Sequence, residues 1–149
     1  MTTSDIETAD RLSRRRARAL PLFAVLFISQ QASFIAARVE DGARSVDQVK
    51  IAAWLVLSVI MLLLLTTGGF WFKPRPVRQL LDDDVTRANR ADALRLGFLA
   101  TMAAGIGTYL LTLAETVTGR EAVHLMMTVG IAAALLRLGW LERRAHRDG

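Results

Sequence analysis

The stretch "IAAWLVLSVIMLLLLTTGGFWF", residues 51–72, decides the fold because no side chain in it carries a charge. At about 1.5 Å rise per residue, roughly 20 helical residues cross a hydrocarbon core of about 30 Å. Three similar stretches occupy 19–37, 96–114 and 122–141. The last includes Arg137, whose long side chain can reach the membrane interface from near a helix end. We expect an all-α integral membrane protein with four transmembrane helices.

A soluble fold is the alternative. The chain has 149 residues, of which 52% are hydrophobic and 22% charged, and the two kinds are segregated along the sequence. A soluble domain of this size cannot bury four helices that are apolar on every side. The absence of cysteine excludes disulfides and cysteine-ligated metals.

The distribution of positive charge predicts the topology. Lysine and arginine number five in the tail 1–18, three between the first two spans, six in the linker 73–95, one between the last two spans and four from Arg137 onward. Cytoplasmic segments of membrane proteins are enriched in these residues, which predicts that both termini, including the tail 142–149, are cytoplasmic. The same bias accounts for the net charge of +5 without a nucleic-acid partner.

The basic tail followed by an apolar run also resembles a signal peptide. The run 19–37 is longer than the hydrophobic segment of a usual signal peptide, and "SFIAA" before Arg38 offers no clear cleavage site. We interpret it as an uncleaved first span.

The acidic and basic stretch "LLDDDVTRANRADALRLGF", residues 80–98, predicts the start of a long helix. Asp82 or Asp83 can cap it, and Asp83 with Arg87 makes a favourable i, i+4 pair. Three consecutive carboxylates point about 100° apart on a helix and cannot converge on one metal ion. We expect a capped helix from about residue 83 to 114, without a metal site.

Small residues predict close contacts between helices. Four pairs of small residues in the third span stand four residues apart: Ala100 with Ala104, Thr101 with Gly105, Ala103 with Gly107, and Ala104 with Thr108. The short connection after 96–114 makes the last two spans an antiparallel hairpin, so that we expect two hairpins in a four-helix bundle. The packing positions we select are Ala100, Ala104, Gly105, Thr108, Gly130 and Ala134.

Two polar clusters are candidate sites. Gln30, Gln31 and Ser33 lie near the middle of the first span, where they either bond across helices or line a permeation path. Glu115 and Glu121 lie with His124 at the extracytoplasmic end, where a metal or proton site competes with a hydrated helix end. We favour the structural role in both cases and expect no cofactor.

Residues at the predicted membrane interfaces are candidates for contact with lipid. Trp54 and Trp71 are spaced to place one indole at each interface. Anionic lipid headgroups are expected to contact the basic residues of the cytoplasmic side. These are Arg14, Arg15, Arg16, Lys73, Arg75, Arg78, Arg87, Arg90 and Arg95.

The motif "LDDDVTRANRADALR" opening the third span resembles uncharacterised four-span bacterial inner-membrane proteins, over residues 78–140. That resemblance implies a fold and a location but no activity. Two other four-span families lack their motifs here. The first span has no glutamate of the kind that small multidrug transporters use, and "RANRADALR" precedes the third span, whereas glutathione-linked membrane enzymes carry their arginine-asparagine pattern in the second.

No nucleophile, base and orienting acid can be assembled from these residues into a catalytic set. We therefore expect a non-enzymatic inner-membrane protein, an accessory or scaffold that packs against itself or another membrane protein. The alternative is a homo-oligomeric channel or small-solute transporter with the polar residues of the first span along its path.

Overall fold

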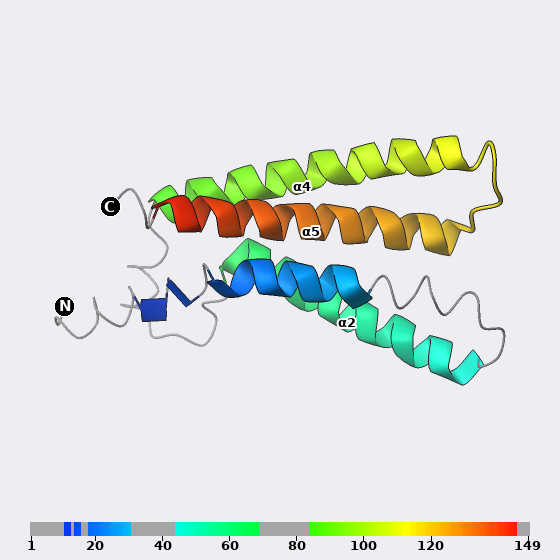
Figure 1. Cartoon of the computed structure of the whole chain (residues 1–149), viewed down its shortest axis with the longest axis horizontal. Helices are drawn as coiled ribbons and strands as arrows, with labels where there is room; N and C mark the ends of the chain where they lie inside the picture. The colour runs from blue at the N-terminus through cyan, green and yellow to red at the C-terminus, as the bar shows by residue number, and fades with distance from the viewer. Residues whose placement is uncertain (1–10, 13, 16–17, 31–43, 69–83, 146–149) are drawn as a thin grey trace.

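The computed structural model describes residues 11–12, 14–15, 18–30, 44–68 and 84–145, and the regular structure in these ranges is entirely helical (Figure 1). The all-α prediction is confirmed. The principal elements are a first helix Arg18–Gln30, α2 Arg44–Thr67, α4 Asp84–Leu111 and α5 Gly119–Ala145.

Three of the helices are long and apolar enough to cross a membrane. They contain 24, 28 and 27 residues for α2, α4 and α5. At about 1.5 Å per residue each exceeds the roughly 30 Å of a hydrocarbon core. The first helix is apolar but shorter, and the rest of the predicted span 19–37 lies outside the described residues. The part of the chain that is described therefore has the composition of a multi-pass membrane protein.

α2 ends earlier than the sequence predicted. We expected the span to reach residue 72, but the helix stops at Thr67, and Gly68 follows it with a φ of 70°. Glycine adopts this left-handed conformation without steric cost, and its N–H donates to Leu64 O at 2.9 Å. Gly68 therefore ends the helix.

α4 is one continuous helix, as the acidic and basic stretch predicted. It begins at Asp84, inside the segment that we assigned to the linker 73–95, and ends at Leu111. Arg87 approaches Asp84 at 3.7 Å, an exposed i, i+3 pair. The expected Asp83 partner and the Asp82 cap lie outside the described residues.

α5 extends beyond the predicted span 122–141 at both ends. Its start carries a capping box, in which Thr118 N donates to Glu121 Oε2 at 3.0 Å and Glu121 N donates to Thr118 Oγ1 at 3.4 Å. Its end continues through Ala145, so Glu142 is a buried helical residue rather than part of a tail.

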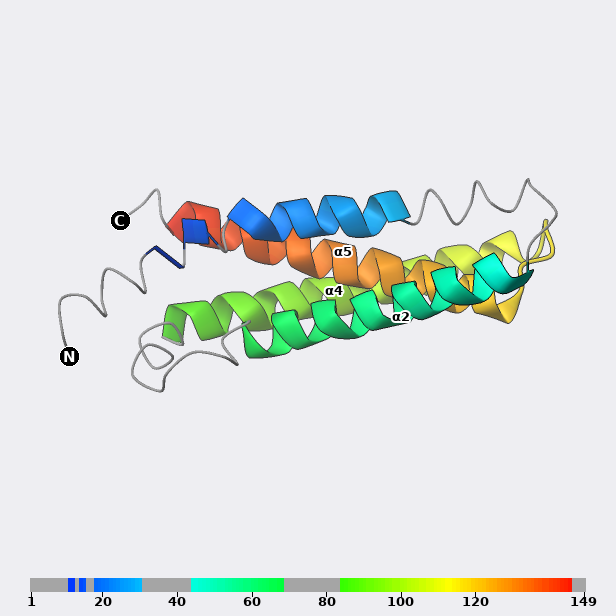
Figure 2. The same cartoon turned by 90° about the horizontal axis from the view of Figure 1, so that it is seen from below.

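α5 lies at the centre of the helix assembly. It forms an antiparallel hairpin with α4, and Figure 2 shows it between the first helix and α2. The first helix buries Leu20, Ala24 and Phe27, which share one face at i, i+4 and i+7. A Cβ atom built on Gly139 of α5 would meet Pro21 Cδ at 3.0 Å, so the first helix packs closely on α5.

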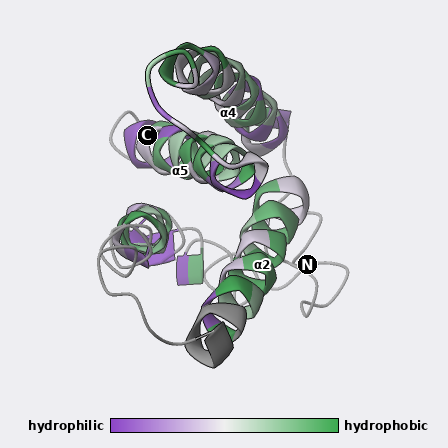
Figure 3. Cartoon of the chain, turned by 90° about the vertical axis from the view of Figure 1, so that its right-hand side faces the viewer, coloured by the Kyte–Doolittle hydropathy of each residue, from purple (hydrophilic) through white to green (hydrophobic). Residues whose placement is uncertain are grey.

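The outward surfaces of α2 and α4 are apolar. Hydrophobic residues colour much of both helices (Figure 3), and Val59 on α2 and Ile106 and Leu110 on α4 are exposed. Half of the most apolar segment of α5 is buried, against 11% of that of α4. Exposing this much apolar surface to water is unfavourable in free energy, whereas contact with acyl chains is not.

Candidate functional site

α4 and α5 approach each other closely where small residues of the two helices meet. A Cβ atom built on Gly97 would lie 2.8 Å from both Ala134 Cβ and Gly130 O. A Cβ atom on Gly130 would in turn collide with Thr101 Oγ1. The backbones approach this closely because neither glycine has a side chain. Gly97 was not among the small-residue positions that we selected, although it stands four residues before Thr101.

The selected packing residues line the same α4–α5 contact to different degrees. Gly130, Ala134 and Thr108 are buried, and a Cβ atom on Gly105 would lie 2.9 Å from Met126 Cε. Ala100 and Ala104 are half-buried. The face of α4 that bears most of these positions is therefore covered by the chain's own α5.

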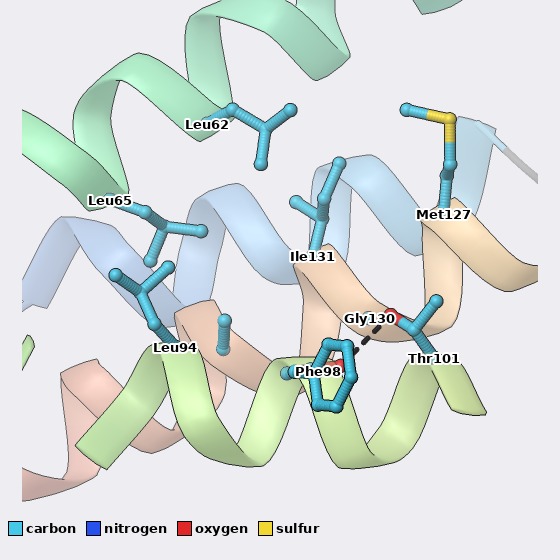
Figure 4. Close-up of a pocket in the computed structure, with 10 residues that line it drawn as sticks. Leu62, Leu65, Leu94, Phe98, Thr101, Met127, Gly130 and Ile131 are labelled. Atoms are coloured by element: carbon cyan, nitrogen blue, oxygen red, sulfur yellow. Dashed lines mark hydrogen bonds between the residues drawn. The ribbon is translucent and has the colours of Figure 1, made fainter. Parts of the chain in front are cut away.

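An apolar cavity of about 180 Å³ adjoins the Gly97–Gly130 crossing. Its lining residues come from α2, α4 and α5 (Figure 4). The cavity is partly open to the outside. The Thr101 hydroxyl donates to Gly97 O at 2.9 Å, so its polarity is satisfied within α4. The lining consists of Leu62, Leu65, Leu94, Gly97, Phe98, Thr101, Met127, Gly130, Ile131 and Ala134.

Arg90 joins α4 to the end of α2. Its Nη1 donates to Thr66 O at 3.1 Å, and the residue is only 9% exposed. Thr66 lies in the last turn of α2, where carbonyl groups have no helical partner and the helix dipole favours a cation. Arg90, which we predicted to contact lipid headgroups, is largely buried here, and its guanidinium donates to the end of a neighbouring helix.

A second polar contact joins α4 to α5 near the same end. Arg137 Nε donates to Asp92 Oδ2 at 2.7 Å. The Arg137 guanidinium also lies over the Trp140 ring, with 4.9 Å from Cζ to the ring centroid, and Arg144 approaches that ring at 5.6 Å. Cations are attracted to the face of an indole at such distances. Asp92 of α4 therefore balances the charge of Arg137, and the Trp140 ring of α5 lies against its guanidinium.

Polar groups are also buried between α2 and α5. The rings of Trp54 and His124 are in contact and tilted, with 4.1 Å between centroids and 33° between planes. Ser58 lies one turn from Trp54 and is 1% exposed. Trp54 Nε1 and Ser58 Oγ have no hydrogen-bond partner among the described residues. Trp54, which we expected at the lipid interface, thus turns its ring into the bundle.

The residues of the predicted extracytoplasmic cluster have separate surroundings. Glu115 is exposed in the turn after α4, Glu121 belongs to the capping box of α5, and His124 is buried against Trp54. No group of three metal-ligating side chains occurs within the described ranges. His124 is a packing residue in this structure.

The predicted polar cluster of the first span is only partly described. Gln30 ends the first helix and is half-buried, whereas Gln31 and Ser33 lie outside the described residues. Among the predicted lipid-contacting residues, Arg14, Arg15, Arg87 and Arg95 are exposed. Those outside the described ranges are Arg16, Lys73, Arg75 and Arg78.

Comparison with family models, curated proteins and solved structures finds no match to this chain. The candidate site therefore rests on geometry alone. It consists of the Gly97–Gly130 crossing, the cavity beside it and the polar contacts of Arg90 and Arg137 at one end.

Proposed function

We propose that the chain is a non-enzymatic, four-span protein of a bacterial inner membrane with both termini in the cytoplasm. In this proposal it acts as an accessory or scaffold subunit that binds a second membrane helix. The charge distribution and the apolar outward surfaces support the location. The packing of α4 supports the role.

The observation that carries the role is a second small-residue pair on the side of α4 that faces away from α5. Ala103 and Gly107 are both exposed, and nothing lies within 4 Å of a Cβ atom built on Gly107. Leu99, Ile106 and Leu110 flank the pair and are exposed as well. Two small residues four apart, bordered by large apolar ones, allow close approach of another helix in lipid.

The partner we propose for this face is a second copy of the chain, since the same pair on both copies forms a self-complementary contact. The chain contains no cysteine, so a single introduced cysteine is the only thiol that can form a disulfide. Ala103→Cys and Gly107→Cys proteins in lipid vesicles are expected to form disulfide-linked dimers on mild oxidation.

Tyr109→Cys is the matched control, because Tyr109 is 68% exposed but lies on a different side of α4. Equal cross-linking at Ala103, Gly107 and Tyr109 would indicate random collision and contradict the proposed face. Monomers at every position would contradict self-association.

A further inference from the structure

The cavity between α2, α4 and α5 has the properties of a site for an acyl chain. Its volume is about 180 Å³ and its lining is apolar apart from Thr101, whose hydroxyl is already bonded to Gly97 O. A cavity needs several polar partners to hold ordered water, and an apolar cavity of this size stays dry or binds an apolar group. Because the cavity is partly open and lies between three helices that are long enough to span a membrane, acyl chains are its nearest neighbours in a bilayer.

One stripe of α4 leads from this cavity to two cations. Leu94, Phe98 and Thr101 line the cavity, and Arg90 and Arg87 precede them at the same helical spacing, one and two turns toward the start of α4. The stripe is therefore apolar along the cavity and positively charged at one end. A molecule that matches it has an apolar tail and an anionic head.

Arg90 places its charge at the end of the cavity. Its Nη1 bonds to Thr66 O, and the neighbouring Leu65 is part of the cavity lining. Arg87 lies one turn further out, with a side chain that is 63% exposed. The positive end of the stripe thus stands where the headgroup of a lipid would lie if its chain entered the cavity.

We propose that an anionic phospholipid binds here, with one acyl chain in the cavity and its phosphate beside the exposed Arg87. A neutral apolar ligand would use the cavity but not Arg87, and a free anion would use Arg87 but not the cavity. This site goes beyond the proposed role of the Ala103–Gly107 face, and binding at it does not require self-association.

The experiment measures lipid retained by the full-length protein when it is released from vesicles of equal parts phosphatidylglycerol and phosphatidylcholine and examined by native mass spectrometry. The wild-type protein is expected to retain phosphatidylglycerol preferentially. Leu62→Trp fills the cavity and is expected to reduce retained lipid by at least about fivefold, the effect of overpacking a well-formed site.

Leu63→Trp is the matched control for the tail. Leu62 and Leu63 are neighbours on α2 with exposures of 39% and 38%, and only Leu62 lines the cavity. The proposal predicts that Leu63→Trp retains lipid like the wild type. Equal losses in the two variants, or no loss in either, would overturn the proposed tail site.

Arg87→Gln tests the headgroup at an exposed residue of α4. Loss of one cation near a lipid surface is expected to lower the preference for phosphatidylglycerol over phosphatidylcholine by about fivefold. Arg95→Gln removes an exposed cation from another side of α4 and is expected to change nothing. No preference in the wild type, or the same change in both arginine variants, would overturn the anionic site. Because Arg87 is exposed, this result stands even if Leu62→Trp fails to fold.

Discussion

Arg137 on α5 and Asp92 on α4 form a 2.7 Å charge-assisted hydrogen bond although 45 residues separate them in sequence. The pair closes one end of the α4–α5 hairpin. It also explains how α5 carries a cation within its apolar stretch: the charge is neutralised by the neighbouring helix. Arg137 was expected to extend toward the interface, and its partner lies in a segment that the sequence assigned to a linker.

The first prediction concerns this pair. Asp92→Asn and Arg137→Gln should each destabilise the hairpin, and their double-mutant cycle should show a coupling of about 0.5–1 kcal/mol, as for partly exposed pairs. Side-chain exposures of 35% and 46% limit the effect. Reversible unfolding in mixed detergent micelles gives the free energies. Strict additivity of the two substitutions would show that the contact contributes nothing.

The second prediction concerns the helix crossing. Gly97→Ala should reduce the free energy of unfolding by about 1–3 kcal/mol, because its Cβ would lie 2.8 Å from a backbone oxygen that cannot rotate away. Gly107→Ala, at a position with open space around the Cβ, should not destabilise the monomer. The same unfolding assay, performed at a dilution that keeps the chain monomeric, separates the two. Similar losses for both glycines would refute the assigned crossing.

The third prediction concerns the end of α2. Arg90→Met removes the donor to Thr66 O and should cost about 1–3 kcal/mol, the range for losing a hydrogen bond made by a charged group. Hydrogen exchange should accelerate in the last turn of α2 and remain unchanged at its middle. Arg95→Met is the control, since Arg95 is exposed. An Arg90 variant with wild-type exchange in that turn would contradict the capping role.

The fourth prediction concerns Ser58. Its hydroxyl is buried without a partner in the described part of the chain, so Ser58→Ala should leave stability unchanged or raise it by up to about 1 kcal/mol. Thermal unfolding in detergent measures the change. A clear loss of stability would mean that this hydroxyl makes a bond that the described residues do not supply.

The sequence predicted the elements of the fold better than their contacts. Length and freedom from charge identified α2, α4 and α5, because a spanning helix needs little more than these two properties. Helix ends were less predictable. Gly68 ends α2 through a backbone conformation, and Thr118 with Glu121 starts α5 through paired side-chain bonds, both of which depend on only one or two residues.

Contacts between helices depend on how each helix is rotated about its axis, which these apolar sequences specify weakly. The hydropathy of Trp54 does not tell whether its ring faces lipid or protein. In the structure the ring faces His124. Arg90 was assigned to the lipid surface because it is charged, yet it is buried at the end of α2. Small-residue spacing indicated that α4 packs closely but not which of its sides faces α5.

The most direct test of the account is whether lipid surrounds the outward faces of α2 and α4. Spin labels on single cysteines at Val59, Met102 and Glu115, in vesicles, report collision with apolar oxygen and with a water-soluble nickel complex. Val59 and Met102, which are 54% and 42% exposed, should collide with oxygen and be protected from nickel, whereas Glu115 in the turn should meet nickel. Nickel collision at Met102 as frequent as at Glu115 would place this surface in water and contradict the membrane fold.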